Sequence, residues 1–270
     1  MGILNIIKYV VLGIVQGITE PLPISSSGHL VILGNLFNTE FNDLNFEIMI
    51  NFGSMIAIIY FFRNELLKTV SGGIKYITTG EKTYKSYFNY IMLLIVGTIP
   101  AGIAGLLLKD KIEQQFVLNT KLIGFCLLIT ALFLYLIRNF KGIKNDNKIT
   151  FKDALTVGIF QAIAIIPGIS RSGTTLVGGM LSDFKRETAL KFSFFLYIPV
   201  SLGSFILGLS DIINTNQLNT VWLPYTLGTI ASAIMTYYAT KFFVDITLKG
   251  KLIYFVYYCL IAGTLTILFL

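Results

Sequence analysis

Charged side chains are scarce in this chain, with Asp, Glu, Lys and Arg making up only 13% of its 270 residues. Soluble globular domains carry about 25% charged residues, so this composition excludes a soluble fold. Apolar residues account for 54% of the sequence, and several apolar runs approach the roughly 20 residues that a helix needs to cross a bilayer. The composition therefore predicts an all-α polytopic protein with a single membrane domain.

Cysteine is almost absent as well. The two cysteines, Cys126 and Cys259, lie inside apolar stretches without metal-site spacing, which argues against a disulfide or a cysteine metal site. The net charge of +7 comes without basic runs interleaved with aromatic residues, so nucleic acid is not an expected partner. The lysines are instead expected to set the orientation of the chain in the membrane.

Long apolar stretches that predict membrane-spanning helices lie at about 46–62, 90–108, 121–138, 190–209, 221–242 and 252–270. Two more, around 3–34 and 153–181, are broken near their middles by proline, serine and glycine. A helix does not run unbroken through such points, and non-helical backbone at membrane depth is tolerated only where protein or water surrounds it. We therefore expect each to be a re-entrant helical hairpin.

The positive charges are distributed unevenly between the loops. Sixteen of the 21 Lys and Arg residues fall in segments 63–89, 138–153, 183–191 and 241–251. The positive-inside rule places these segments in the cytoplasm, which requires 3–34 to return to the outside and 153–181 to return to the inside. Two opposed hairpins, each followed by three spanning helices, form an inverted-topology repeat. We expect the repeats to be 1–145 and 146–270, with both termini outside.

The two broken segments also share a sequence motif at an offset of 145 residues. Residues 13–28, GIVQGITEPLPISSSG, and 158–173, GIFQAIAIIPGISRSG, are identical at eight of sixteen positions. Duplicated membrane halves with broken segments in corresponding places point to a central site between them. The copies differ in chemistry, because Glu20 and His29 lie in or beside the first and Arg171 lies in the second.

Glu20, His29 and Arg171 are the ionisable residues expected at membrane depth, and His29 is the only histidine. A charged group in the bilayer interior is costly and by default indicates function. A Glu20–Arg171 pair that only ties the repeats together is the structural alternative. Buried ion pairs contribute weakly to stability, however, and such a tie leaves the neighbouring serines unexplained.

Three consecutive serines, Ser25, Ser26 and Ser27, stand between Glu20 and His29. Any one of them could cap a helix, but three exceed what capping requires. If a helix begins near Ser25, then Ser26 and His29 share one face. This spacing predicts that the imidazole contacts the Ser26 hydroxyl or the leaving oxygen of a substrate.

The second motif offers different groups. Ser170, Arg171, Ser172 and Thr174 surround an expected helix start, where free N–H groups and the positive end of the helix dipole bind anions. Arginine can also grip phosphate with two parallel hydrogen bonds. The first repeat therefore supplies a nucleophile with acid–base groups, and the second supplies a phosphate clamp.

At these residues the chain resembles the undecaprenyl-pyrophosphate phosphatase family, the bacitracin-resistance type of integral membrane phosphatase. The family motif E-G-x-T-E-F-L-P-[IV]-S-S-[ST]-G-H corresponds to Gln16–His29, and P-G-x-S-R-S-G corresponds to Pro167–Gly173. The resemblance implies a hydrolase that releases phosphate from undecaprenyl pyrophosphate at the outer face of the bacterial plasma membrane, which recycles the lipid carrier for cell-wall synthesis. It also implies a divalent cation, Mg or Ca, and a homodimer.

The first motif departs from the family at two positions. Gln16 stands where many members have Glu, and Pro21 replaces Phe. Glu20 is therefore the one carboxylate of this motif. That weakens a metal site built on two carboxylates, while Gln16 can still donate to phosphate or accept from a metal-bound water.

The residues and the resemblance together assign roles. We expect Ser26 to be the nucleophile, His29 the general base and then acid, Arg171 the stabiliser of the transferring phosphoryl group, and Glu20 a base or metal ligand. Attack by His29 itself, or by water activated through Glu20, stays open. The expected substrate-binding residues are Gln16, Ser25, Ser27, Ser170, Ser172 and Thr174.

The alternative function is an inverted-repeat transporter or a lipid flippase, because broken mid-membrane helices are common in transporters. The Ser-x-x-His spacing and the arginine from the other repeat favour hydrolysis, since transport needs no nucleophile. A purely structural membrane subunit would not need three buried ionisable residues.

Overall fold

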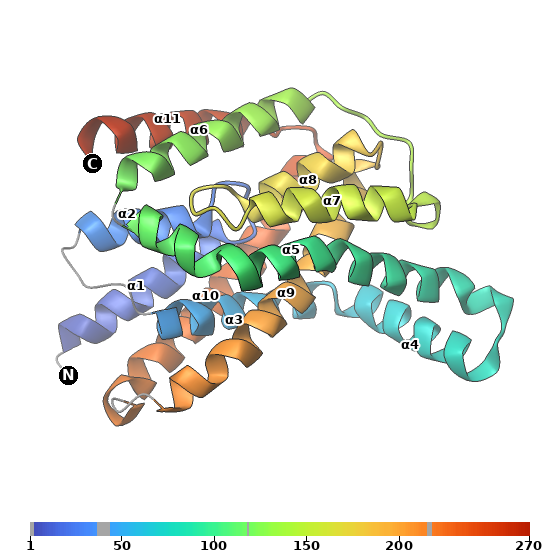
Figure 1. Ribbon diagram of the computed structural model, residues 1–270, viewed down its shortest axis with the longest axis horizontal. Coiled ribbons are helices and arrows are strands. Elements are labelled where there is room, and N and C mark those ends of the chain that lie inside the picture. Colours follow the sequence, from blue (N-terminus) through green and yellow to red (C-terminus); the bar gives the residue numbers. More distant parts are fainter. Residues whose placement is uncertain (1–2, 37–43, 118, 215–217) are drawn as a thin grey trace.

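The computed structural model describes residues 3–36, 44–117, 119–214 and 218–270, and these residues form eleven α-helices and no β-strand (Figure 1). The helices preceding the second motif are α1 (Ile3–Thr19), α2 (Ser26–Leu36), α3 (Leu44–Phe61), α4 (Arg63–Thr79), α5 (Lys85–Val117) and α6 (Thr120–Ile137). The remaining helices are α7 (Phe151–Ile163), α8 (Arg171–Leu181), α9 (Arg186–Asn214), α10 (Leu218–Leu248) and α11 (Ile253–Phe269). The expected all-α membrane architecture is confirmed.

Both proposed hairpins are broken where the sequence predicted. Helix α1 ends at Thr19 and α2 begins at Ser26, while α7 ends at Ile163 and α8 begins at Arg171. The backbone turns through left-handed conformations at these breaks, with φ of 67° at Ser25 and 90° at Gly168. A positive φ interrupts a right-handed helix, so each chain segment can reverse direction at mid-bundle.

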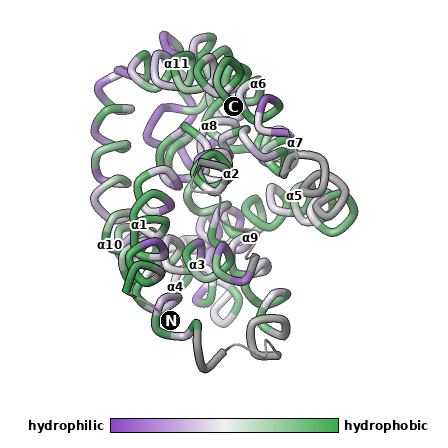
Figure 2. Tube along the Cα trace, turned by 90° about the vertical axis from the view of Figure 1, so that its left-hand side faces the viewer, coloured by the Kyte–Doolittle hydropathy of each residue, from purple (hydrophilic) through white to green (hydrophobic). Residues whose placement is uncertain are grey.

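Helices α5, α6 and α9 are each long and apolar enough to cross a membrane, and two bent helix pairs raise the number of spans to as many as five. One bent pair is α10 with α11, whose 118° bend turns the chain back on itself. The other bent pair is α3 with α4, so the described residues hold three to five candidate spans where about six were expected. Large apolar side chains such as Leu106, Phe125 and Ile230 are half or more exposed on these helices, as lipid-facing residues should be. Figure 2 shows hydrophobic residues along much of α5, α10 and α11.

Helix α4 is an element that the search for apolar runs missed. It follows α3 across a sharp bend of 80°, within a segment expected only to be a cytoplasmic connection. Charged and polar residues are interspersed among its apolar ones, so no long apolar run signals it. Two glycines let it pack closely on α5, because a Cβ at Gly72 would lie 2.5 Å from the ring of Tyr87 and one at Gly73 would lie 2.4 Å from Ile91.

The inverted repeat is visible in how the helices pack. Helix α1 packs on α10 in the same way as α7 packs on α5. Gly13 touches the backbone at Gly228, where an added Cβ would lie 2.1 Å from the carbonyl oxygen, and its counterpart Gly158 touches Gly97, where the distance would be 2.5 Å. Helices α6 and α11 lie side by side at the edge of the molecule (Figure 1). This reciprocal packing agrees with the inverted repeat expected from the sequence.

The two ends of the bundle differ in charge. Helix α4 and the connection between α6 and α7, which carry lysine-rich segments, lie toward one end, and both chain ends lie toward the other (Figure 1). This arrangement agrees with the orientation expected from the positive-inside rule. The breaks of both hairpins lie between these ends (Figure 1).

Candidate active site

The breaks of the two hairpins meet at an ion pair. Arg171, the first residue of α8, donates through Nη2 to Oε1 of Glu20, which directly follows α1. The side chains are only 16% and 7% exposed, respectively. The Glu20–Arg171 pair that the sequence analysis raised as the structural alternative is therefore present. It brings together the two residues whose counterparts in the other repeat, Ile165 and Ser26, are uncharged.

The carboxylate of Glu20 accepts hydrogen bonds from three side chains. Gln16, one turn earlier on α1, donates through Nε2 to Oε2 of Glu20 over 3.0 Å. The hydroxyl of Ser26 donates to the same oxygen, and Arg171 occupies the other. The carboxylate thus holds a candidate nucleophile and a candidate phosphate ligand in one place, and Gln16 takes part in this arrangement in place of a second carboxylate.

Arg171 has unused capacity to bind an anion. Its Nη1 is buried and has no hydrogen-bond partner within the described residues. The guanidinium lies over the ring of Tyr197 on α9, with Cζ 3.6 Å from the ring centroid, which is a favourable cation–π distance. The flat side of the group is therefore held by an aromatic ring, while one nitrogen remains available to a ligand.

Several serines of the two motifs form matching helix caps. The hydroxyl of Ser25 accepts from the backbone N–H of Gly28 over 3.3 Å, and that of Ser170 accepts from Gly173 over 3.1 Å. Ser27 and Ser172 lie beside these caps, with hydroxyl oxygens 3.5 and 3.2 Å from those of Ser25 and Ser170. Because both repeats contain this arrangement, it is part of the helix starts themselves. The position between the paired serines is Ser26 in one copy and Arg171 in the other.

A cavity of about 240 Å³ collects most of the expected site residues. Its lining includes Gln16, Glu20, Ser25, Ser26, Ser27, Ser170 and Arg171, together with Glu47, Asn51, Tyr197 and Ser201. The breaks of both hairpins and the helices α3 and α9 surround it. A cavity in which several polar and ionisable groups converge is the default candidate for an active or binding site.

Three expected site residues do not line this cavity. Ser172 donates instead to the carbonyl of Leu22 over 2.9 Å and so ties the hairpins together. Thr174 donates to the carbonyl of Ser170 over 3.0 Å within its own helix. Both are almost fully buried, because their hydroxyls satisfy backbone groups at the helix start.

His29 is the third, and its predicted contact with Ser26 is not formed. Its Nδ1 lies 2.7 Å from the carbonyl oxygen of Ser25, and its Nε2 lies 2.6 Å from the hydroxyl of Tyr258 on α11. The two rings also stack, with centroids 5.6 Å apart. One helical turn does place Ser26 and His29 on neighbouring positions, but the phenol of Tyr258 offers the imidazole a partner on the other side.

Sequence reasoning missed a polar network on the opposite wall. Tyr197 donates through its hydroxyl to the backbone oxygen and to Oδ1 of Asn51, over 3.0 and 3.1 Å, and Ser201 donates to the same Oδ1. These residues are neutral and sit in apolar helices, so a search for charges at membrane depth passes over them. A spacing of four between Tyr197 and Ser201 on α9 was the available signal.

Gln161 shows how the second repeat differs from the first. It is the counterpart of Gln16 and is 2% exposed, yet neither its Nε2 nor its Oε1 has a partner within the described residues. The residue that corresponds to Glu20 is Ile165. The second hairpin therefore keeps the amide without the carboxylate that the amide binds in the first.

A metal site made by the protein alone is not evident. The described residues include no group of three or more His, Cys, Asp and Glu side chains placed to hold a metal ion. In the cavity, both oxygens of Glu20 already accept hydrogen bonds. Mg²⁺ and Ca²⁺ prefer several oxygen ligands, so a cation here would need oxygens from the substrate in addition to those of the protein.

Comparison with known proteins gives matches along nearly the whole chain. Residues 9–265 match the family described as bacitracin resistance protein BacA. Undecaprenyl-diphosphatase 1 of Bacillus cereus is 48% identical over 265 residues, which cover 98% of each chain. Undecaprenyl-diphosphatase 1 of Bacillus licheniformis is 44% identical over the full length of both proteins. Undecaprenyl-diphosphatase of Oceanobacillus iheyensis is 45% identical over 98% of this chain and 97% of its own.

Proposed function

This chain belongs to the bacitracin resistance protein BacA family, and from that membership we propose how it hydrolyses undecaprenyl pyrophosphate. It is an integral membrane phosphatase that acts on a polyprenyl pyrophosphate. The products are undecaprenyl phosphate and inorganic phosphate, so the reaction recycles the lipid carrier for cell-wall synthesis and supports resistance to bacitracin. The alternative of a transporter or flippase is not favoured, because the similar proteins are named as diphosphatases.

The free Nη1 of Arg171 is the observation that carries the proposed mechanism. Guanidinium groups bind phosphate with two parallel hydrogen bonds, and one nitrogen here has no partner within the described residues. An incoming phosphate would bind Nη1 and displace Glu20 from Nη2, which completes the bidentate contact. The backbone N–H groups at the start of α8 add a favourable helix dipole.

The same displacement prepares the nucleophile. Glu20 already accepts the Ser26 hydroxyl hydrogen, so release from Arg171 leaves it free to take that proton. The Ser26 oxygen then forms a bond to the terminal phosphorus, and the bond from phosphorus to the bridging oxygen breaks, with the electron pair leaving on undecaprenyl phosphate. Glu20 passes its proton to this leaving group.

Water completes the turnover. It attacks the phosphoserine, giving a proton to Glu20, and the bond between phosphorus and the Ser26 oxygen breaks. Ser26 recovers its proton from Glu20 and phosphate leaves. The sequence spacing suggested His29 as the general base. In this proposal Glu20 takes that role instead. A direct attack by water activated through Glu20 is the competing route that variants of Ser26 distinguish.

His29 acts in this scheme as a positioning residue. Its Nδ1 bonds to the carbonyl of Ser25, the residue whose left-handed conformation precedes Ser26. Its Nε2 fixes the ring against Tyr258. His29 therefore holds the start of α2 in the conformation that directs Ser26 at Glu20.

A divalent cation, Mg or Ca, belongs to the proposal as a partner of the substrate. Glu20 is the protein ligand that we assign, with Glu47 on the same cavity wall and the remaining ligands supplied by pyrophosphate oxygens, as is common for Mg²⁺. When bound, such an ion neutralises charge on the transferring phosphate.

We further place the protein in the bacterial plasma membrane with its cavity open to the outer face. The lysine-rich end would then lie in the cytoplasm by the positive-inside rule. The isoprenoid tail would lie among the apolar helices, and the family resemblance adds a homodimer. Chemical crosslinking in membranes would test the dimer, and the labelling experiment described in the Discussion tests the orientation.

Phosphate release by the purified protein, given undecaprenyl pyrophosphate in detergent, tests the function, and Arg171 tests the mechanism. Arg171→Lys keeps the charge but loses the planar pair of donors, so we expect a folded protein with turnover reduced by about two orders of magnitude or more. Arg171→Ala should be essentially inactive and still insert in the membrane. Normal hydrolysis by Arg171→Lys would show that bidentate phosphate binding is the wrong role, and misfolding of both variants would show that the guanidinium is a structural tie.

A further inference from the structure

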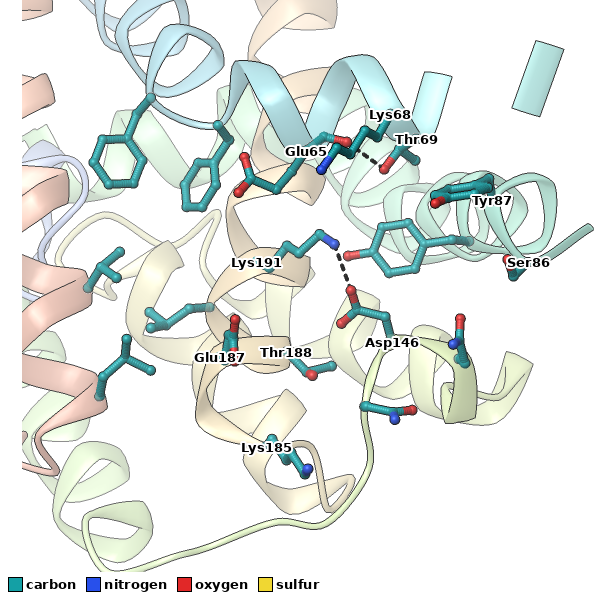
Figure 3. A pocket seen from close by; sticks show the side chains of 18 residues that line it. Glu65, Lys68, Thr69, Ser86, Tyr87, Asp146, Lys185, Glu187, Thr188 and Lys191 are labelled. Atoms are coloured by element: carbon teal, nitrogen blue, oxygen red, sulfur yellow. Dashed lines mark hydrogen bonds and ion pairs between the residues drawn. The ribbon is translucent and has the colours of Figure 1, made fainter. Parts of the chain in front are cut away.

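A second and larger cavity of about 830 Å³ lies at the lysine-rich end of the molecule, between α4, the first turns of α5 and α9, and the end of α10 (Figure 3). It shares no lining residue with the active-site cavity. Lys191 on its wall precedes Tyr197 of the active site by six residues of α9, which is about 9 Å along a helix. The proposed hydrolysis uses no group in this cavity.

Hydrogen-bond donors gather on one part of its wall. Lys68 of α4 and Lys191 of α9 extend into the cavity (Figure 3). Lys191 lies 2.6 Å from Asp146 and 5.3 Å from the ring centroid of Tyr90. An ammonium group has three donors, so the pair with Asp146 leaves Lys191 able to bind a further acceptor.

Tyr90 adds an unused polar group. The residue is only 6% exposed and lines the cavity, yet its buried hydroxyl has no hydrogen-bond partner within the described residues. A buried polar group without a partner destabilises the folded state. A ligand oxygen that accepts from this hydroxyl and from Lys191 would remove that cost.

Carboxylates balance the lysines of the same wall. Its charged residues are Lys68, Lys185 and Lys191 together with Glu65, Asp146 and Glu187. Within the described part of the chain, Glu65 and Glu187 form no ion pair. A wall with equal numbers of positive and negative groups favours a ligand that carries both signs over a simple anion or cation.

Apolar residues form the rest of the wall. Phe61, Phe62, Leu190, Val244 and Leu248 line the cavity beside the charged groups. Phe62 also packs on Phe194 and Phe195 of α9, so this side continues into the apolar core. Charged groups next to an apolar wall, at the end of a membrane bundle, suit the boundary between a lipid headgroup and its acyl chains.

We propose that this cavity binds the headgroup of a zwitterionic phospholipid that carries a phosphate and a primary ammonium. Lys68, Lys191 and the Tyr90 hydroxyl hold the phosphate, and Glu65 and Glu187 accept hydrogen bonds from the ammonium. The ligand is a structural lipid, distinct from the substrate, and the site does not depend on the mechanism of hydrolysis.

Thermal unfolding of the purified protein in detergent tests this site. Four probes are added separately: short-chain phosphatidylethanolamine, phosphatidylcholine, phosphatidylglycerol and inorganic phosphate. Ligands that bind only the folded state raise Tm, and a concentration near 100 times Kd should give a rise of about 5 °C for a chain of this size. We expect that rise with phosphatidylethanolamine and less than half of it with the other three probes.

Variants of residues that line the cavity test whether phosphatidylethanolamine binds there. Tyr90→Phe removes only the hydroxyl, Lys68→Gln removes an exposed phosphate donor, and Glu187→Gln removes the charge expected to face the ammonium. Each should lower the affinity for phosphatidylethanolamine by about tenfold. Lys75→Gln is the matched control, because Lys75 is an exposed residue of α4 that does not line the cavity, and it should leave the affinity unchanged.

Several results would overturn the proposal. Equal shifts with all three lipids would indicate a general effect of lipid, and a shift with inorganic phosphate as large as that with phosphatidylethanolamine would indicate a simple anion site. Unchanged affinity in both Lys68→Gln and Tyr90→Phe would place the lipid elsewhere. Phosphate release from undecaprenyl pyrophosphate, measured in the same preparations, should stay within about twofold of the parent protein and reports that the variants are folded.

Discussion

One carboxylate organises the chemistry of this protein. Glu20 accepts from Gln16, Ser26 and Arg171 at once, so its neighbours are held in place before substrate arrives. Such preorganisation is the main contribution a protein makes to phosphoryl transfer, where positioning and electrostatics dominate. Two of the three donors come from the first hairpin and one from the second, so the arrangement around Glu20 requires both halves of the chain.

The assignment of Ser26 as nucleophile makes a direct prediction. Ser26→Ala should lower kcat by about three orders of magnitude, as the removal of a catalytic nucleophile does. Ser27→Ala, which removes a hydroxyl beside the cap at Ser25, should cost tenfold or less. Phosphate release with the two variants side by side decides the point. Near-normal turnover by Ser26→Ala would make water, activated through Glu20, the attacking group.

Tyr197 should support Arg171 through its ring and Asn51 through its hydroxyl. Tyr197→Phe keeps the ring and should lower kcat/KM only a few-fold. Tyr197→Leu removes the cation–π contact, worth about 2 kcal/mol when desolvated, so we expect kcat/KM to fall by about tenfold or more, mainly through weaker binding of phosphate. Steady-state kinetics on both variants separates the two contributions, and an equal loss in both would assign the effect to the hydroxyl.

The sequence predicts the ionisable residues of the candidate site, but not its neutral polar residues. Glu20 and Arg171 stand out in an apolar chain because a charge at membrane depth needs a reason, and Ser26 stands out by its place in a run of serines. Tyr197, Asn51 and Ser201 escape notice because neutral polar side chains are ordinary in apolar helices. The orientation of His29 depends on Tyr258, which is 229 residues away, and no local spacing reports such a partner.

Pairs of helices in this fold approach each other through glycine. The contacts of α1 with α10 and of α7 with α5 bring backbone against backbone at Gly13 and Gly158, a mode of packing favoured inside membranes. Of these helices, α1 and α7 lead directly into the two hairpin breaks. A change in their spacing would therefore move Glu20 relative to Arg171.

Gly13→Ala tests that coupling. The added Cβ would lie 2.1 Å from the carbonyl oxygen of Gly228, so the helices must separate, at a cost of about 1–3 kcal/mol. We expect Tm to fall by about 5 °C and turnover to fall with it. Gly102→Ala on α5 is the control, because a Cβ there has no neighbour within 4 Å, and Tm should not fall. Equal Tm values for Gly13→Ala and the parent protein would contradict the close approach.

Hairpins and spanning helices were predictable because proline and glycine interrupt long apolar runs at defined places. Helix α4 was not, because polar and charged residues interrupt its apolar residues and leave no such run. Its register against α5 depends on two glycines, Gly72 and Gly73, and glycine in an isolated sequence signals flexibility as readily as close packing.

The molecule has a lysine-rich end and an opposite end at which both termini lie, and thiol labelling tests which end faces the cytoplasm. Cysteines placed at Lys75, Lys144 and Lys249 should be shielded from impermeant thiol reagents added to intact cells, because the positive-inside rule puts them in the cytoplasm. Cysteines at Asn42, Asn119 and Asn216 should be labelled, although Asn42 and Asn216 lie outside the described residues. Labelling of positions 144 and 119 from the same side would contradict the inverted repeat. The exact boundary between 1–145 and 146–270 stays a prediction.

The unpaired amide of Gln161 has a consequence for the ancestry of the protein. The glutamine that binds Glu20 in one half has a counterpart in the other half, where the amide group binds nothing within the described residues and its burial is unfavourable. The eight identities between the two motifs indicate that both hairpins derive from one ancestral segment, within which positions 20 and 165 have since diverged to Glu and Ile. The repeated hairpins therefore carry a single candidate reaction centre, at the break of the first. Apolar substitutions of Gln161 should accordingly be among the first stabilising changes that laboratory evolution finds.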